Sequence, residues 1–164
     1  MSAPEKEQEI VAAVRDKFGQ DLLDSRIQRP RTIFATISSS ILTNCVKFLS
    51  ESFGLRHLAT ITGIDLGKDI GVYYHLLGGE IAMSLRVDTP KTEPRLPSII
   101  SLIPGAVFYE REIHDMFGVF FEGHPDLSPL ILPDGWPKDV FPLRKEWKTE
   151  AIKAEISKTV SDKT

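Results

Sequence analysis

The chain has 164 residues and a formal net charge of -3, which suits one domain with a proper hydrophobic core. Its acidic balance and the lack of any basic run argue against nucleic-acid binding, which relies on clustered lysine and arginine. The single cysteine, Cys45, cannot form an internal disulfide or supply the several thiolates of a zinc or iron-sulfur centre.

The N-terminus lacks the basic start and apolar core of a secretory signal. The longest apolar runs fall short of the about 20 residues that a membrane helix needs. We therefore expect a soluble, cytoplasmic polypeptide, which is compatible with a place on the surface of a membrane complex.

The first predicted element is an amphipathic helix that begins at Pro4 and ends before Gly19, because its apolar residues recur at helical spacing. The run RTIFATIS from Arg31 is β-branched and alternating, which predicts a strand. The segment SILTNCVKFLSESFG that follows has apolar residues at helical spacing and predicts a helix that Gly54 ends.

Three further strands are predicted in LRHLATITGID, GVYYHLL and EIAMSLRV. Short turns join them, so the simplest arrangement is an antiparallel meander. A strand that returns through a helix usually lies parallel to its predecessor, with a right-handed crossover. The predicted fold class is therefore α+β: a single domain with a small mixed or antiparallel sheet, in strand, helix, three-strand order, flanked by helices.

A helix is predicted over 106–117, with Gly118 as its C-cap. Steps of 100° place one apolar stripe on Ala106, Tyr109, Ile113, Met116 and Phe117. The opposite face carries Arg111, His114 and Asp115, and Arg111 and Asp115 can pair because they lie four residues apart. Glu110 and Glu112 flank the apolar stripe, where partial burial of a carboxylate demands a cationic partner.

The segment 118–147, which we call the strap, is rich in proline and has no periodicity. Proline fixes its own dihedral and removes a backbone donor, so the strap is predicted to be extended. It nevertheless holds many large apolar side chains: Phe120, Phe121, Leu130, Ile131, Leu132, Trp136, Phe141 and Trp147. We expect these to be covered partly by the chain's own body and partly by another subunit.

The end of the strap offers Arg144 and Lys145 as cations. We expect the sequence PLRK to fold back so that Arg144 meets Glu110 or Glu112. The three predicted regions are thus a core domain at 1–117, the strap at 118–147, and a tail at 148–164. The tail can form a helix, since Ile152, Ile156 and Val160 are spaced four apart.

The stretch EREIHDMFGVFFEGHPDL, followed by PLRK, resembles the signature of the C-type (30 kDa-type) subunit family of respiratory complex I, the proton-pumping NADH:quinone oxidoreductase. Upstream, SLIPGAVFYEREIHD, ITGIDLG and GVYYHLL are similar to the family's approach to this helix and to its sheet. The resemblance covers about residues 31–147.

The chain departs from the complex I members at Ser128 and Pro129, where they usually carry paired arginines. The ending LPDGWPKDVFPLRKEW is more similar to energy-converting membrane-bound nickel-iron hydrogenases, ferredoxin-driven complexes, and the dehydrogenase of a reduced deazaflavin coenzyme. These departures bear on the identity of the electron donor and acceptor of the complex, and they leave the assignment to the family unchanged.

The resemblance implies a subunit without a cofactor of its own in a membrane-bound, ion-translocating complex. Iron-sulfur clusters, with a nickel-iron centre or flavin, would belong to partner subunits. The implied partners are the large subunit with the quinone pocket or nickel-iron centre, and the small cluster-bearing subunit, at the cytoplasmic face of the membrane. We expect the contact residues to be Glu110, Arg111, Glu112, Asp115, Phe117, Phe121, His124, Pro125, Asp126, Trp136, Pro142, Leu143, Arg144 and Lys145.

Two alternatives remain from the residues alone. Glu110, His114, His124 and Asp126 could supply a metal site, since residues four apart share a helix face and the strap could return two ligands. The second alternative is a free-standing α+β binding module in which the strap is a ligand lid. A subunit made for an interface would expose more apolar surface than a monomer tolerates, which separates the subunit from the free-standing module.

Overall fold

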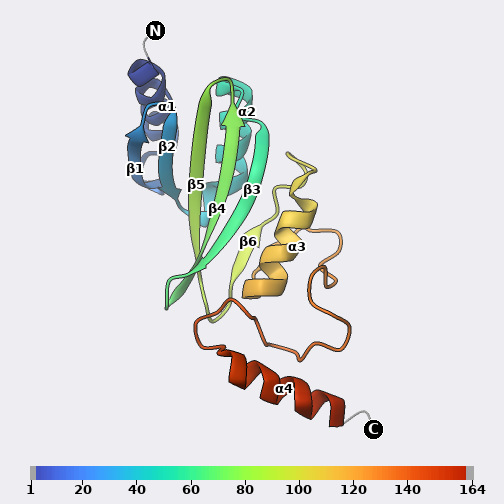
Figure 1. Cartoon of the computed structure of the whole chain (residues 1–164). Helices are drawn as coiled ribbons and strands as arrows, with labels where there is room; N and C mark the ends of the chain where they lie inside the picture. Colours follow the sequence, from blue (N-terminus) through green and yellow to red (C-terminus); the bar gives the residue numbers. More distant parts are fainter. Residues whose placement is uncertain (1–2, 162–164) are drawn as a thin grey trace.

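The computed structural model describes residues 3–161, and it contains four α-helices and seven strands within that range (Figure 1). The helices are α1 (Ala3–Phe18), α2 (Leu42–Phe53), α3 (Ala106–Phe117) and α4 (Thr149–Ser161). The strands are β1 (Leu22–Arg29), β2 (Thr32–Ile37), β3 (His57–Asp65), β4 (Asp69–Gly78), β5 (Ile81–Pro90), β6 (Arg95–Pro97) and β7 (Phe120–Glu122).

The main sheet has five strands in the order β1-β2-β5-β4-β3. The pairs β3–β4 and β4–β5 are antiparallel, as the short turns between them predict, and β2 pairs with β5 in parallel. The chain thus leaves β2 through α2, forms β3 at the far edge of the sheet, and returns by the meander to the middle. The predicted α+β class and mixed sheet are confirmed.

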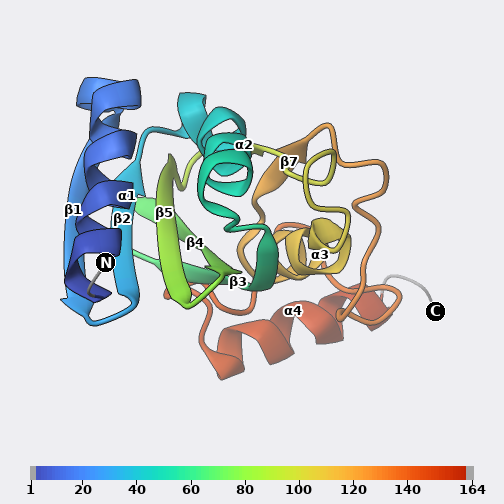
Figure 2. The same cartoon turned by 90° about the horizontal axis from the view of Figure 1, so that it is seen from above.

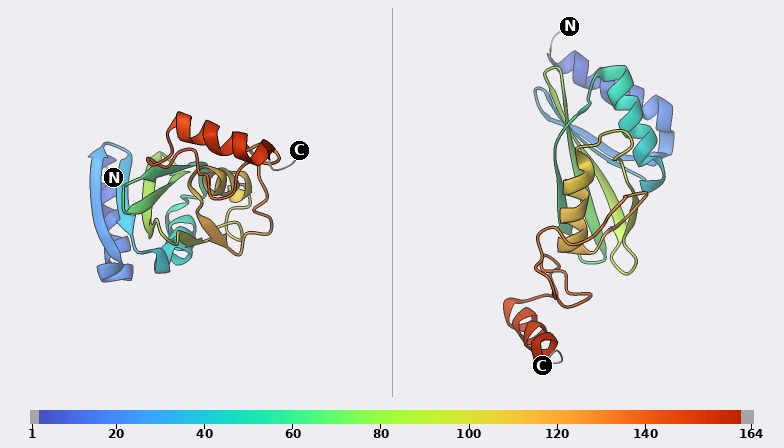
Figure 3. Two further views of the ribbon diagram at one scale, coloured as in Figure 1. Left: turned by 90° about the horizontal axis from the view of Figure 1, so that it is seen from below. Right: turned by 90° about the vertical axis from the view of Figure 1, so that its right-hand side faces the viewer.

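Helices α1 and α2 cover one face of this sheet (Figure 3). Their apolar stripes meet the inward side chains of the strands, and Ile10 and Val14 of α1 and Leu42 and Leu49 of α2 are almost completely buried. Cys45 also lies in this core, and burial raises the pKa of its thiol to about 12. Cys45 thus behaves as a small buried hydrophobic residue, which is the most common role of a lone cysteine.

Two features were not predicted. Strand β1 pairs antiparallel with β2 at the edge of the sheet, and its side chains are mostly exposed, so it lacks the alternation that marks a half-buried strand. Strands β6 and β7 have three residues each and pair in parallel, which ties the loop after β5 to the start of the strap. Elements this short give no periodic signal.

Helix α3 lies beside β3, at the opposite end of the sheet from β1 and β2 (Figure 2). The approach is close, because a Cβ atom at Gly63 would lie 2.4 Å from the Phe117 ring. The Tyr109 hydroxyl donates to the Ala59 carbonyl across the same contact (3.1 Å). Helix α3, which carries the charged residues predicted to make subunit contacts, is therefore held against the edge strand β3.

Helix α4 lies apart from the body, below the strap (Figure 1; Figure 3). Ile152 and Ile156 of the predicted stripe are half-buried, while the side chain of Val160 lies outside the described residues. No helix within residues 3–161 is long and apolar enough to cross a membrane.

Candidate subunit-contact site

The strap begins at Gly118, whose left-handed conformation (φ 72°) ends α3 as predicted. After β7 it runs without regular structure to Lys148, and it passes around the lower end of α3 (Figure 1). Such a segment stays in place only if specific partners satisfy its backbone groups. Three sets of contacts do so.

The first set comes from the outward face of α3. One oxygen of Asp115 accepts the backbone N–H groups of Leu130 (2.9 Å), Ile131 (2.8 Å) and Leu132 (3.2 Å). Arg111 donates to the carbonyls of Ser128 and Pro129 and to the Ser128 hydroxyl. A charged group makes these hydrogen bonds stronger than neutral ones.

The predicted pair between Arg111 and Asp115 is therefore wrong, since each side chain binds the strap instead. Asp115 was placed on the face opposite the apolar stripe, yet it is only 4% exposed. The strap itself covers it. Helical periodicity identifies the face that Asp115 shares with Arg111, but it carries no information about a distant segment that folds onto that face.

The second set holds the PLRK sequence to the end of α3. Arg144 Nε donates to the Phe117 carbonyl (2.7 Å), and Leu143 N–H donates to the Met116 carbonyl (3.2 Å). The Arg144 guanidinium also lies over the Phe141 ring. A cation here satisfies a terminal carbonyl and opposes the negative end of the helix dipole.

The fold-back of PLRK is as predicted, but its partner is not. Within residues 3–161, Arg144 makes no ion pair with Glu110 or Glu112, and its nearest carboxylate is that of Glu146, at 4.0 Å. The helix C-terminus attracts Arg144 in place of a side-chain carboxylate. Backbone acceptors of this kind leave no mark in the sequence.

The third set is an ion cluster at the end of β3. Asp65 Oδ2 accepts Lys91 Nζ (2.5 Å) and the backbone N–H of Lys145 (2.8 Å), and Oδ1 accepts the N–H of Gly67 (2.7 Å). Burial opposes ionisation of Asp65, but these hydrogen bonds outweigh it and lower its pKa to about 2. Lys91 is also paired with Glu146.

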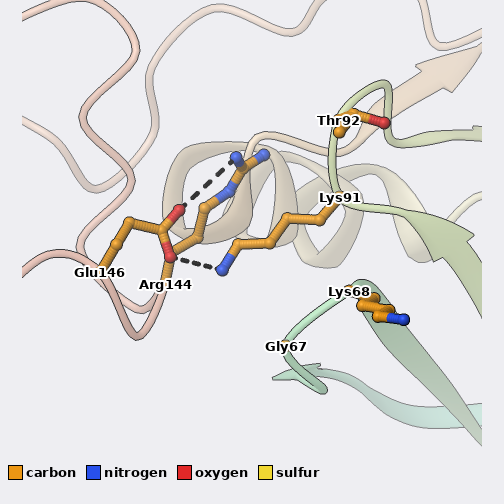
Figure 4. Close-up of a pocket in the computed structure, with 6 residues that line it drawn as sticks. All are labelled: Gly67, Lys68, Lys91, Thr92, Arg144 and Glu146. Atoms are coloured by element: carbon orange, nitrogen blue, oxygen red, sulfur yellow. Dashed lines mark hydrogen bonds and ion pairs between the residues drawn. The ribbon is translucent and has the colours of Figure 1, made fainter.

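This cluster adjoins an open hollow of about 490 Å³. Figure 4 shows Glu146 between Arg144 and Lys91, while the ammonium group of Lys68 points away from them. Asp65 was not predicted as a site residue. The only available signal was an acidic residue at the end of a predicted strand, which is also typical of a turn.

Glu110 occupies the inward side of α3 and is fully buried. Its Oε1 accepts the Ile99 N–H (2.9 Å), and its Oε2 has no partner among the described residues. Burial is the main cause that raises the pKa of Glu110, and the hydrogen bond from the Ile99 N–H opposes it. The prediction of a rim position paired with a cation is wrong, because the segment around Ile99 closes over this carboxyl group.

The alternative metal site is not assembled. His114 Nδ1 donates to the Val119 carbonyl (2.9 Å), and His124 Nε2 donates to the Val107 carbonyl (3.0 Å). Asp126 accepts the backbone N–H and the hydroxyl of Ser128. These side chains satisfy local backbone groups, and residues 3–161 contain no cluster of three or more His, Cys, Asp or Glu that could hold a metal.

The remaining predicted contact residues divide between the body and the surface. Phe117 and Phe121 are buried, Pro142 is half-buried, and the Trp136 indole N–H donates to the Val140 carbonyl (2.7 Å). Glu112, Pro125 and Lys145 are exposed. The outward apolar side chains of the strap are Phe120 (43% exposed), Leu130 (40%), Ile131 (53%) and Leu143 (56%).

The fold and these contacts define an α+β protein whose extended segment is pinned to its body yet turns apolar side chains outward. Residues 35–153 match the family described as the respiratory-chain NADH dehydrogenase 30 Kd subunit. The match covers well over half of the sequence, and the chain belongs to this family.

Particular relatives come from several kinds of complex. The chain is 30% identical to the C-type subunit of NADH-quinone oxidoreductase from Chloroherpeton thalassium, over 91% of this chain and 64% of the relative. It is 34% identical to formate hydrogenlyase subunit 5 of Escherichia coli, over 89% of this chain and only 26% of the relative. It thus spans less than two thirds of the length of either protein.

The structure is also similar to a chain of the membrane-bound sulfane sulfur reductase, an archaeal respiratory membrane complex. The TM-score is 0.74 at 25% identity, and the match covers 93% of this chain and 92% of the other. The similarity therefore includes the strap as well as the sheet.

Proposed function

We propose that this chain is a subunit of the peripheral arm of a membrane-bound, ion-translocating electron-transfer complex. In this proposal it packs on the large subunit, next to the small cluster-bearing subunit, and supports their assembly. It holds no redox group itself, and iron-sulfur clusters, with a nickel-iron centre or flavin, belong to its partners. The complex lies with this arm at the cytoplasmic face of the membrane.

The observation that carries the proposal is the combination of a fixed strap and outward apolar side chains. Leu130 and Ile131 are half exposed although Asp115 holds their backbone N–H groups. Their exposure is therefore a property of a defined surface. Apolar side chains held outward in this way are typical of protein interfaces.

The relatives support a large polypeptide as the partner. The part of formate hydrogenlyase subunit 5 that matches this chain is about a quarter of that protein, so a similar region is there joined covalently to a much longer polypeptide. Where a region of this family is not joined covalently to such a polypeptide, a non-covalent surface must bind it. The strap is a candidate for that surface.

The test is affinity purification of the tagged chain from membranes in mild detergent, with identification of every co-purifying polypeptide and quantification of nickel and iron. We expect a large subunit and a cluster-bearing subunit to be recovered. Nickel would assign the complex to the hydrogenase type, and iron without nickel, with quinone-type membrane subunits, to the dehydrogenase type. Recovery of a lone, monodisperse monomer would contradict the proposal.

A matched pair of variants tests the surface itself. The double substitution Leu130→Ser and Ile131→Ser should reduce recovery of the large subunit. Leu23→Ser on β1 changes a side chain that is 60% exposed, at the other end of the sheet, and should leave recovery unchanged. Equal recovery with both variants would exclude the strap as the contact.

A further inference from the structure

A groove of about 200 Å³ lies between the edge strand β3 and helix α3. Its floor is formed by the buried side chains of Ile113 and Phe117 from the helix, and the exposed Leu143 of the strap also lines it. The rim is polar and carries Thr60 and Thr62 of the strand and Glu112 of the helix. The residues that line it are Thr60, Ile61, Thr62, Gly63, Glu112, Ile113, Met116, Phe117 and Leu143.

Glu112 differs from the other acidic residues of α3. Glu110 accepts a backbone N–H and Asp115 accepts three. Glu112 is exposed and has neither a hydrogen bond nor an ion pair with any residue in the described range. The cation predicted for it, Arg144, is held instead by the Phe117 carbonyl. The groove therefore carries an uncompensated negative charge at its rim.

The groove is also continuous with the surface assigned to the partner. Leu143, which lines the groove, is 56% exposed and belongs to the same strap as the outward-facing Leu130 and Ile131. A segment that covers Leu143 therefore also reaches Glu112. Its contact with an apolar floor and a carboxylate rim favours a side chain with an apolar stem and a cationic end.

We propose that this groove receives a basic side chain, arginine or lysine, carried by a segment of the large partner subunit and paired with Glu112. The inference rests on the proposed function and adds to it the position and chemistry of one contact. The stem of the basic side chain lies on Met116 and Leu143, and its charged end meets the Glu112 carboxylate. Thr60 and Thr62 line the groove beside it, and their hydroxyls already have partners in the chain, the Ile61 carbonyl (3.4 Å) and His75 Nε2 (3.2 Å).

The first test is site-specific photo-crosslinking in the assembled complex, with benzoylphenylalanine at Thr62. We expect a crosslink to a peptide of the large subunit that contains arginine or lysine. The same group at Ala12, exposed on α1, is the control and should not give this product. A complex that assembles without a Thr62 crosslink, or with a crosslink only to this chain, would overturn the inference while leaving the proposed function intact.

The second test reverses the charge. Glu112→Lys should lower recovery of the large subunit by at least about tenfold, because like charges then face each other across an interface. Reversal of the crosslinked basic residue to Glu should restore recovery. Glu51→Lys, on an exposed site of α2, should have no effect.

The thermal midpoint of each variant chain separates binding from folding. Glu112 makes no hydrogen bond or ion pair within the described residues, so Glu112→Lys should leave this midpoint unchanged. Unchanged recovery with Glu112→Lys, or a failure of the reciprocal reversal to restore it, would contradict the ion pair. A chain that recovers no partner at all contradicts the proposed function, and the groove contact with it.

Discussion

The backbone N–H of Lys145 donates a hydrogen bond of 2.8 Å to Asp65 Oδ2, although the two residues are 80 positions apart. This contact closes the strap onto the end of the sheet. Lys91, from the loop after β5, binds the same oxygen and so supplies the positive charge that a buried carboxylate requires. The geometry of the strap's end therefore depends on the ionised form of one side chain.

Stability should fall in acid because of Asp65. Its pKa is lowered from 3.8 to about 2 in the folded chain, so it stabilises the fold above pH 4, and this contribution is lost as the pH falls through about 2. It amounts to about 1–2 kcal/mol after allowance for solvent screening. Urea unfolding followed by tryptophan fluorescence at pH 2–7 measures it.

The matched variant is Asp65→Asn. It should unfold at a lower urea concentration at pH 7, and its stability should no longer show the fall in acid that Asp65 causes. Both tryptophans, Trp136 and Trp147, lie in the strap and report on its release. A variant with the wild-type pH profile would show that Asp65 does not control the stability of this segment.

Asp115→Ala should loosen the middle of the strap. Three backbone N–H groups lose their charged acceptor, which costs about 2–3 kcal/mol because water can replace only part of it. We expect a lower free energy of unfolding and faster proteolysis near Leu130. Asp134→Ala, an exposed acidic site on the same strap, is the control. Equal protection of the two variants from protease would contradict the role of Asp115.

Glu110→Gln should have the opposite sign to Asp65→Asn. The pKa of Glu110 is raised, so the wild-type chain loses stability as the pH rises through that pKa and the buried carboxyl ionises. The amide keeps the oxygen that accepts the Ile99 N–H but cannot ionise. The variant should therefore be more stable than the wild type at pH 7, with a smaller difference at pH 4.

The same urea titrations test this prediction, with the exposed Glu112→Gln as the control. Glu112→Gln should leave the free energy of unfolding unchanged at both pH values. Destabilisation by Glu110→Gln at pH 7 would show that the ionised carboxylate has a partner that stabilises it in the fold.

Local signals in the sequence predict the elements well. The limits of α3 follow from its apolar spacing and from Gly118, and the meander follows from short turns between alternating strands. The extended strap follows from its prolines. These features depend on neighbours in sequence, where backbone sterics and periodicity act directly.

The contacts between distant segments were not predicted. The burial of Glu110 depends on the segment around Ile99, and that of Asp115 depends on Leu130 and the residues after it. Arg144 was assigned a carboxylate because charge pairing can be inferred from residue types, whereas its actual acceptor is a backbone carbonyl. Any residue type can supply such an acceptor, so no sequence pattern identifies it.

Gly63→Ala should separate α3 from β3. The new Cβ would lie 2.4 Å and 2.5 Å from two atoms of the Phe117 ring, and the ring is buried against the sheet, so the helix must shift. Overpacking of this kind costs about 1–3 kcal/mol, and we expect a lower melting temperature by circular dichroism.

Gly105→Ala is the control, because its Cβ meets nothing within 4 Å and its φ of -62° suits any residue. This variant should keep the wild-type melting temperature or exceed it slightly, since alanine restricts the unfolded chain. If Gly63→Ala has the same melting temperature as Gly105→Ala, then Phe117 can turn aside and the position of α3 does not depend on this contact. If it melts lower and also recovers less of the large subunit, the seat of α3 on β3 is what holds the strap and the groove in the geometry that the partner needs.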